Sequence, residues 1–313
     1  MRKIEDRFNH NFHYPWTFMN DKPFTDDFIT RTTGLASGPV EFVHIPKSDW
    51  STPKSANGTR ILEGMLSLIE EGVIYAGSVS YRHMCRFNSG FFMHQKALLK
   101  YDWYWRVEPD IEMYCDVTYD PFTFLRTTGK LYGFVLAMYE FAATIPSLWD
   151  ETKAFVAANP QYLAADNALP FISDDASAAS QSPADRSVKG DYNLCHFWSN
   201  FEIASLDFFR GEAYTKYFEH LENAGGFFYE RWGDAPVHTL ALSLFLPKDK
   251  IHHFADIGYK HTHAARCPQD DASHDQGRCV CDREDNYDTD SHSCAPRWFK
   301  RRLFPYPSLH AQL

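Results

Sequence analysis

The sequence predicts an α/β domain with a largely parallel sheet. The chain has 313 residues, which is long enough for one large α/β domain or two small ones. Apolar residues make up 44% of it and aromatic residues 16%, so a sizeable core is expected and general disorder is not. Segments with strand character alternate with segments of helix character, and this alternation is typical of α/β domains.

The first predicted elements follow from apolar patterns and from the residues that stop them. The end of a helix at residues 4–8 leads into a strand at residues 16–19. Residues 60–71 are expected to form an amphipathic helix, because apolar side chains recur on one stripe before Gly72. The stripe consists of Ile61, Leu62, Met65, Leu66 and Ile69. A short strand is expected next, at residues 73–75.

The most informative segment is residues 101–122, which hold six carboxylates among seven aromatic residues. A strand-like run at residues 104–107 leads directly into Glu108, Pro109 and Asp110. Proline cannot extend a central strand, so the chain should turn there and present two acids at the end of a buried strand. Ligands bind at such points in open α/β sheets, and acids suit a hard divalent cation that holds a phosphate. A buried strand followed by an ordinary polar loop is the alternative.

The second half of the chain continues the alternation. Residues 130–138 are apolar almost throughout, as expected of a central strand. A helix should open at Pro146 and end near Pro160. Residues 173–190 are of low complexity and are interpreted as a flexible surface insertion.

Two further helices and a loop-rich tail complete the predicted organisation. Residues 202–223 are expected to be helical and to end at Gly225, and residues 235–245 form a second apolar helix. Residues 264–313 are expected to be a loop-rich tail. This tail contains Cys267, Cys279, Cys281 and Cys294. Their spacing is not that of a zinc ribbon, so disulfides are favoured over a zinc site. The odd total of seven cysteines leaves at least one thiol unpaired.

The charge balance bears on partners and compartment. The chain has 31 Lys and Arg against 41 Asp and Glu, a formal net charge of −10, and no basic stripe. Nucleic acid is therefore an improbable partner. Asn57-Gly58-Thr59 is an N-glycosylation sequon, and together with the cysteine-rich tail it favours a secretory compartment. No signal peptide or membrane span is visible in the sequence.

Two segments place charged residues in informative settings. Arg82 and Arg86 lie four apart and would share a helix face suited to a diphosphate, although a solvated helix face is the alternative. Glu202 lies among aromatic residues that include Trp198, and a carboxylate there is costly unless it is paired or functional. The alternative for Glu202 is an exposed acid on the first turn of a helix.

Two later segments offer further polar candidates. Arg231 and Asp234 flank Trp232, and Asp234 is interpreted either as a helix N-cap or as an acceptor for a sugar hydroxyl. Four histidines fall within residues 251–263. A single histidine is more often structural, but this cluster makes one metal ligand a candidate.

These segments resemble the fungal α-1,2-mannosyltransferases of glycosyltransferase family 15. The blocks that carry the resemblance are YWRVEPDIEMYCDV, SYRHMCRFNSGFF, NLCHFWSNFEIASLDFFRGEAYTKYFEHL, GGFFYERWGDAPVH and IHHFADIGYKH. The resemblance extends from about residue 5 to residue 294. It implies a GT-A-like, Rossmann-like nucleotide-sugar transferase fold with a mixed central sheet flanked by helices.

The resemblance also implies an activity and a compartment. Such a protein transfers mannose from GDP-mannose to the 2-hydroxyl of a mannose-terminated glycan in N- or O-linked protein mannosylation, with retention and with Mn2+ as cofactor. It is a type II membrane protein of the Golgi, with its catalytic domain in the lumen. We interpret residues 1–313 as a single catalytic domain, and we expect the strand that family members carry upstream to be missing, along with the stem and membrane anchor.

The family roles are carried over residue by residue. Glu108 and His261 are the implied manganese ligands. The implied catalytic residues are Glu202, proposed as nucleophile, Tyr81 on the reacting face of the donor and Asp234 on the acceptor side. The donor and substrate contacts are expected from Arg82, Arg86, Asp110, Trp198, Arg231 and Trp232. The sequence leaves open whether Glu202 attacks the sugar or stabilises oxocarbenium-like charge during front-face transfer.

Two other functions compete with this interpretation. One is a catalytically inactive sugar-binding or scaffold protein of the same fold. The other is a metal-dependent phosphohydrolase that acts on a nucleotide sugar and releases free mannose.

Overall fold

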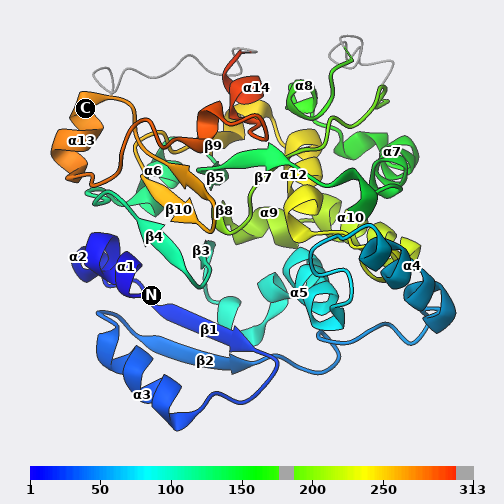
Figure 1. Cartoon of the computed structure of the whole chain (residues 1–313), viewed down its shortest axis with the longest axis horizontal. Coiled ribbons are helices and arrows are strands. Elements are labelled where there is room, and N and C mark those ends of the chain that lie inside the picture. Colours follow the sequence, from blue (N-terminus) through cyan, green and yellow to red (C-terminus); the bar gives the residue numbers. More distant parts are fainter. Residues whose placement is uncertain (176–186, 301–313) are drawn as a thin grey trace.

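The computed structural model describes residues 1–175 and 187–300 and has helices packed around a small central sheet (Figure 1). Four strands form this sheet in the order β3-β8-β5-β9. They are β3 (Trp103–Val107), β8 (Phe201–Ser205), β5 (Tyr132–Phe134) and β9 (Ile251–His253). β8 is antiparallel to β3 and β5, whereas β5 and β9 are parallel. The predicted mixed sheet is thus confirmed, and the expectation of a largely parallel sheet is wrong.

The central sheet has two different faces, because successive side chains of a strand point to opposite sides. Trp105 and Phe201 belong to a core that also contains residues of the N-terminal helical segment. Tyr104, Arg106 and Glu202 point to the opposite face, where α12 (Asp234–Phe245) packs. β3 is only half-buried, whereas β8 is buried along its whole length. One strand face therefore carries apolar packing and the other carries polar groups.

A group of helices forms the second and larger core with α12 (Figure 1). They are α5 (Val79–Gly90), α7 (Leu148–Ala158), α8 (Leu169–Ile172), α9 (Leu206–Arg210), α10 (Glu212–Ala224) and α11 (Gly226–Tyr229). α12 is buried over its full length, in agreement with the apolar segment predicted at residues 235–245. α10 ends at Gly225, which has a φ of +76°. The next residue, Gly226, lies so close to Trp232 that a Cβ there would be 2.0 Å from the indole.

A three-stranded antiparallel sheet in the order β11-β10-β4 lies beside the central one. Its strands are β4 (Ile111–Met113), β10 (Tyr259–His261) and β11 (Ala264–Arg266). Val107, the last residue of β3, is followed by Glu108, then a turn at Pro109 and Asp110, and then β4. The predicted turn after the aromatic strand is thus confirmed. His261 pairs with Ile111 across the sheet, so β10 places His261 beside this turn.

The N-terminal part forms a unit at the lower left of Figure 1. It consists of α1 (Arg2–Ile4), a π-helical stretch (Glu5–Asn9), α2 (His10–Phe12), β1 (Trp16–Asn20), α3 (Asp26–Leu35) and β2 (Val40–His44). β1 and β2 pair in parallel. Residues 4–8 are helical as predicted, but the helical stretch ends at Phe12 and not near residue 8. The predicted strand at 16–19 is confirmed by β1. The remaining elements are α4 (Gly58–Glu70), α6 (Pro121–Thr127), β6 (Ala137–Tyr139), β7 (Cys195–Phe197), α13 (Asp271–Gly277) and α14 (Ala295–Lys300).

Three element predictions need correction. Residues 73–75 form turns rather than a strand, and Tyr75 has a φ of +61°, outside the extended region. Residues 130–138 contain parts of two strands, because the chain leaves β5 after Phe134 and β6 pairs with β7 instead. Residues 202–223 begin in β8 and become helical only at Leu206. The predicted helix at 60–71 is confirmed by α4, and the helix from Pro146 to Pro160 by α7.

The predicted disulfides of the C-terminal tail are present, and two of them bond the tail to the body of the protein. Cys115 pairs with Cys279 and Cys195 with Cys294, and a third disulfide joins Cys267 to Cys281 within the tail. The remaining cysteine, Cys85, has a buried free thiol. Residues 176–186 of the predicted insertion and residues 301–313 of the tail lie outside the described residues.

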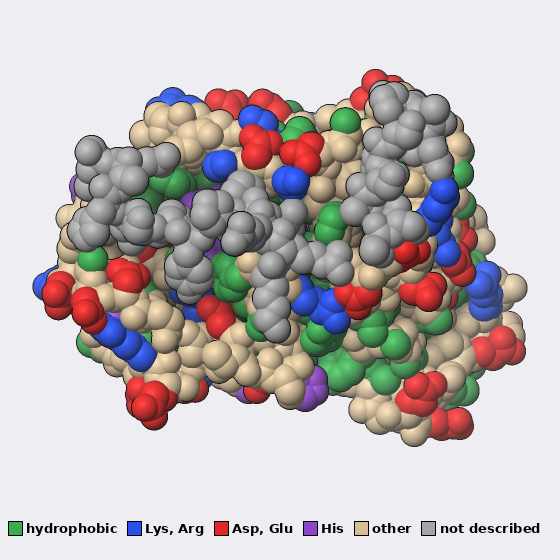
Figure 2. All heavy atoms as spheres, turned by 90° about the horizontal axis from the view of Figure 1, so that it is seen from above, with side chains coloured by type: hydrophobic (Ala, Val, Ile, Leu, Met, Phe, Trp, Pro, Cys, Tyr) green, Lys and Arg blue, Asp and Glu red, His purple; other side chains and the backbone are tan. Residues whose placement is uncertain are grey.

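The surface agrees with the acidic composition. On the face shown in Figure 2, acidic and basic side chains are intermixed, and its described part carries no continuous basic area. Within residues 1–175 and 187–300, no helix combines the length and the apolar character needed to cross a bilayer.

Candidate active site

A cavity of about 1010 Å³ lies between the N-terminal unit and the central sheet. Side chains of β1 and α3 line one side of it, among them Phe18 and Phe28. β3 lines another side along its whole length and continues into Glu108 and Pro109. Of the predicted site residues, Glu108 and Glu202 line this cavity. A cavity of this size is large enough for a ligand such as a nucleoside diphosphate.

Glu108 lines this cavity, and His261 on β10 lies beside the turn that follows Glu108. The acids at positions 108 and 110 are close enough to His261 to raise its pKa, but burial has the larger effect and lowers the pKa overall. A lowered pKa keeps the imidazole neutral, which is the form that binds metals. Nδ1 of His261 is buried and has no hydrogen-bond partner in the described part of the chain. The pair therefore offers a carboxylate and a free imidazole nitrogen, a donor set that fits Mn2+.

Arg106 connects Glu108 to the rest of the site, and the sequence did not single it out. Its Nε donates to Glu108 Oε1 at 2.7 Å, and another of its nitrogens forms an ion pair with Asp234. Burial lowers the pKa of Arg106, but Asp234 and Glu108 outweigh this effect and raise it well above its usual range. Arg106 is therefore a permanent cation between two carboxylates.

Asp234 is the first residue of α12, and Gly233 is the N-cap. The N-cap interpretation of Asp234 is therefore wrong. Its carboxylate accepts hydrogen bonds from Arg106 and, at 2.7 Å, from Ser199 Oγ. Burial raises the pKa of Asp234, but Arg106 and the other partners outweigh it and lower the pKa. Asp234 is thus an ionised acid in a fixed position at the helix N-terminus, where the helix dipole also favours its charge.

Glu202 lies on β8 and not on a helix, so the interpretation as an exposed first-turn acid is wrong. Its side chain is 1% exposed. Oε1 accepts a hydrogen bond from Tyr104 at 2.7 Å, and Oε2 accepts one from Tyr132 at 3.2 Å. His238 Nδ1 lies 3.1 Å from the same Oε2. Burial and the carboxylate raise the pKa of both tyrosines, which therefore remain neutral donors.

The strand register explains why these groups meet. Arg106 on β3 lies directly opposite Glu202 on β8, so both side chains emerge on the same face of the sheet. Asp234 and His238 are four residues apart on α12 and therefore share one helix face. Asp234 contacts Arg106, and His238 contacts Glu202. The site is thus built where one helix face packs on one sheet face.

Tyr81 and Arg231 form a second polar group near Asp234. The guanidinium carbon of Arg231 lies 5.1 Å from the centre of the Tyr81 ring. Arg231 is 4% exposed, its Nη2 lies 3.8 Å from Glu140 Oε1, and its Nε has no partner in the described residues. Burial is the main reason that the pKa of Tyr81 is raised. A buried donor without a partner is a group that a ligand can satisfy.

Three predicted binding residues have contacts that support a structural role. Arg82 is fully buried, and its nitrogens donate to the carbonyls of Ala76 and Glu230, although its Nη2 has no partner in the described residues. Arg86 forms a bidentate ion pair with Glu222. Trp232 is fully buried. Both arginines are buried, so their interpretation as a solvated helix face is wrong, and neither is among the residues that line the cavity.

The remaining candidates lie near the two candidate metal ligands. Asp110 is exposed on the turn after β3 and has a φ of +58°. The ring of Trp198 lies 5.2 Å from that of His261. Of the other histidines in residues 251–263, His253 is buried, and its Nε2 lies 3.1 Å from the Val135 carbonyl oxygen. His253 is therefore structural, and His261 is the histidine of this cluster that offers a free buried nitrogen among the described residues.

Comparison with a protein-family model shows where this chain belongs. The model described as glycolipid 2-alpha-mannosyltransferase matches residues 1–302. The O-glycoside alpha-1,2-mannosyltransferase homolog 3 of Schizosaccharomyces pombe is 52% identical over 300 residues, covering 96% of this chain and 77% of the relative. Glycolipid 2-alpha-mannosyltransferase 2 of Candida albicans is 49% identical over 302 residues, covering 96% of this chain and 63% of the relative.

Two solved structures are similar to the whole chain. Core-mannan synthase A from Aspergillus fumigatus, in its Mn/GDP form, has a TM-score of 0.86 at 42% identity, covering 96% of this chain and 79% of that one. The mannosyltransferase Ktr4p from S. cerevisiae in complex with GDP has a TM-score of 0.89 at 41% identity, covering 97% of this chain and 77% of that one. These matches confirm the predicted GT-A-like fold.

Proposed function

The chain belongs to the glycolipid 2-alpha-mannosyltransferase family, glycosyltransferase family 15, and from this premise we propose that it is a retaining α-1,2-mannosyltransferase. It transfers mannose from GDP-mannose to the 2-hydroxyl of a mannose acceptor in N- or O-linked protein mannosylation. The names of the relatives support the reaction, and the GDP complex of the Ktr4p structure supports the donor.

The observation that carries this proposal is the meeting of Glu108, Arg106 and Glu202 beside one large cavity. The cavity offers room for a nucleotide sugar, Glu108 lies beside the candidate ligand His261, and Glu202 is a fixed carboxylate next to the reacting region. A sugar-binding protein without activity needs none of this costly burial of charge.

Mn2+ is the cofactor, as the Mn/GDP form of core-mannan synthase A supports. Glu108 and His261 are the residues that would hold it, because the imidazole is neutral and has an unpartnered buried nitrogen. When bound, the ion neutralises the charge of the departing diphosphate. Arg106 holds the Glu108 carboxylate in position from the protein side and adds a second positive charge nearby.

Glu202 is proposed to act on the sugar itself. Three hydrogen-bonding partners surround its two oxygens, and its side chain is 1% exposed. This environment supports electrostatic stabilisation of oxocarbenium-like charge more than covalent attack, because hydrogen-bond donors withdraw electron density from a nucleophile. The acceptor or the reacting face of the donor is proposed to contact Asp234, Arg231 and Tyr81. The surroundings of the candidate metal ligands are proposed to include Asp110 and Trp198.

The proposed compartment is the Golgi lumen. Three disulfides support an oxidising compartment, and so does the exposed Asn57 sequon. Attachment to the membrane through an N-terminal anchor is part of this proposal, on the grounds of family membership.

The test is mannose transfer from GDP-mannose to methyl-α-mannoside, with Mn2+ and with a chelator. The expected product is an α-1,2-linked disaccharide that forms only with the metal. Release of free mannose without acceptor would instead support a phosphohydrolase. Binding of GDP-mannose without any product would support the inactive sugar-binding alternative.

A further inference from the structure

His238 is a buried histidine within an otherwise largely apolar helix. It lies in the middle of α12, and its side chain is 1% exposed. Its two ring nitrogens have different neighbours: Nδ1 lies 3.1 Å from Glu202 Oε2, and Nε2 lies 3.0 Å from the carbonyl oxygen of Asn88. These two contacts restrict where protons can be.

The carbonyl of Asn88 can only accept a hydrogen bond, so Nε2 of His238 must carry a proton. Nδ1 faces a carboxylate oxygen. If Nδ1 had no proton and Glu202 were ionised, two lone pairs would face each other between two side chains that are each 1% exposed. One proton must therefore lie between Nδ1 and Oε2.

We propose that His238 is a positioning residue for Glu202, that the contact between them holds one proton, and that this proton orients the carboxylate for mannose transfer. The inference rests on the proposed function, and it adds a residue and a protonation state to it. Tyr104 and Tyr132 supply the other two donors. With His238 protonated, both oxygens of Glu202 are held by donors from β3, β5 and α12.

The charges around His238 agree with a protonated ring. Glu202 faces it from β8, Arg106 lies on β3, Asp234 is one turn earlier on the same helix, and Tyr214 packs 6.0 Å away from α10. Burial lowers the pKa of His238, but Glu202 and Asp234 outweigh burial and Arg106, so that the pKa is raised. The apolar rings of Phe92 and Phe209 lie 6.4 Å and 4.7 Å from the His238 ring and complete its surroundings.

Two substitutions separate the two contacts of the imidazole. His238→Asn places an amide nitrogen near the position of Nδ1 and keeps a donor for Glu202. His238→Gln reaches to the position of Nε2, so it keeps the contact to the Asn88 carbonyl and loses the donor to Glu202. Neither contact is proposed to involve the nucleotide, so the affinity for GDP with Mn2+ should stay within about twofold of the wild-type value in both variants.

The readouts are kcat, KM and the pH profile of mannose transfer. His238→Gln should lower kcat roughly tenfold to hundredfold with little change in KM for GDP-mannose, and His238→Asn should recover most of this loss. Wild-type kcat should fall at alkaline pH as the pair loses its proton. This alkaline decrease in kcat should be absent in His238→Asn, because an amide does not titrate. A purely structural residue would not produce this difference between the profiles.

Equal kcat values and pH profiles for wild type and His238→Gln would overturn the inference, and so would an equal loss in both variants. If the variants do not fold, a neutron structure of the wild-type protein decides. Deuterium between Nδ1 and Oε2 supports the inference, and its absence refutes it. Failure of the proposed function looks different, because then the wild-type protein itself would not transfer mannose.

Discussion

Glu108 is the residue whose loss should most directly affect metal binding. Glu108→Gln replaces an ionised ligand with a neutral amide but keeps its size. We expect the Mn2+-dependent affinity for GDP to fall at least roughly 100-fold, because even the loss of an outer-shell partner costs up to that much. Isothermal titration with GDP, with and without Mn2+, measures the effect.

Glu112→Gln is the matched control for this substitution. Glu112 lies in the same acidic segment but forms a half-exposed ion pair with Lys3 at 2.7 Å. Exposed ion pairs contribute little, so this variant should bind GDP and Mn2+ as wild type does. Equal affinities for Glu108→Gln and wild type would remove Glu108 from the proposed ligand set.

The raised pKa of His238 should make the free energy of unfolding decrease as pH rises. Its pKa is raised in the folded protein, so its contribution is fully present below about pH 6.5, the ordinary histidine value, and is lost as pH rises through the folded pKa. Between about pH 6.5 and the folded pKa of His238, the free energy of unfolding should fall by at most about 1.4 kcal/mol per pH unit. Urea unfolding of wild type and His238→Asn across this pH range measures it. Parallel curves for the two proteins would contradict the raised pKa.

At the scale of elements, β8 shows where sequence reasoning stops. Residues 202–223 are predicted to form one helix, whereas the structure has β8, then α9, and then α10 after Gly211. Phe201 to Ser205 instead pair with β3, a strand about 100 positions earlier in the chain. Such a partner leaves no local pattern. β3, its turn at Pro109 and α12 were predictable, because each depends on residues that are adjacent in sequence.

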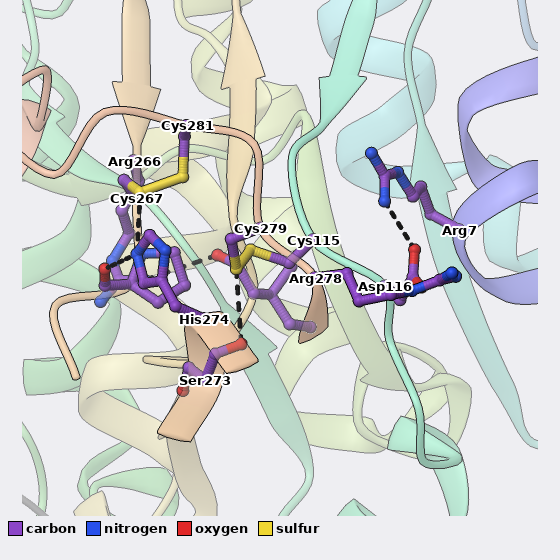
Figure 3. The surroundings of a disulfide bond; sticks show 12 residues. Arg7, Cys115, Asp116, Arg266, Cys267, Ser273, His274, Arg278, Cys279 and Cys281 are labelled. Carbon is purple, nitrogen blue, oxygen red and sulfur yellow. Dashed lines mark hydrogen bonds and ion pairs between the residues drawn. A yellow bond between two sulfur atoms is a disulfide. The ribbon is translucent and has the colours of Figure 1, made fainter. Parts of the chain in front are cut away.

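The tail disulfides should stabilise the sheet that carries His261. β4 is followed by Cys115 and β11 by Cys267, and both cysteines bond to the short segment Cys279-Val280-Cys281 (Figure 3). Both edges of the β11-β10-β4 sheet are thus tied to one segment, and Asp116 beside Cys115 also forms ion pairs with Arg7 and Arg278. The disulfides therefore restrain the strand that holds the candidate metal ligand.

We predict that the double substitution Cys115→Ser and Cys279→Ser lowers the free energy of unfolding by roughly 2 to 5 kcal/mol, as expected for a disulfide that closes a long loop. It should also weaken Mn2+-dependent GDP binding, because β4 and β10 are less restrained. Thermal unfolding and GDP titration measure the two effects. Replacing both Cys267 and Cys281 by Ser is the comparison, since that disulfide closes a loop of only 14 residues and should cost less. If the variant that lacks Cys115 and Cys279 were as stable as wild type and had the same GDP affinity, the sheet would need no such restraint.

At the scale of the whole molecule, the candidate site contains some residues that the sequence predicts and others that only the structure identifies. Local patterns mark a turn at Glu108, a helix start at Asp234 and a cluster of four histidines. The resemblance to the family then selects His261 from this cluster and implies the roles of all three residues. Arg106, Tyr104, Tyr132 and His238 were missed, because they lie inside apolar strands and a helix and look like core residues. The pairing of β3 and β5 with β8 brings Tyr104 and Tyr132 to Glu202. The packing of α12 on the central sheet brings His238 to Glu202 and Asp234 to Arg106. The cysteine pairing was likewise open, since spacing does not determine which thiols meet.

The cavity predicts how the whole chain responds to its ligand. β1 and α3 of the N-terminal unit line it together with β3 and β8 of the central sheet. A ligand that fills the cavity must therefore contact both parts and couple their stabilities. GDP with Mn2+ at 100 times the dissociation constant should stabilise the protein by about 2.7 kcal/mol. Hydrogen exchange should then slow in β1 and α3 as well as in β3, whereas GDP with a chelator, or Glu108→Gln with both ligands, should protect neither part. Slower exchange in β3 alone would mean that the nucleotide occupies only the end near Glu108, and that the N-terminal side of the cavity serves another ligand.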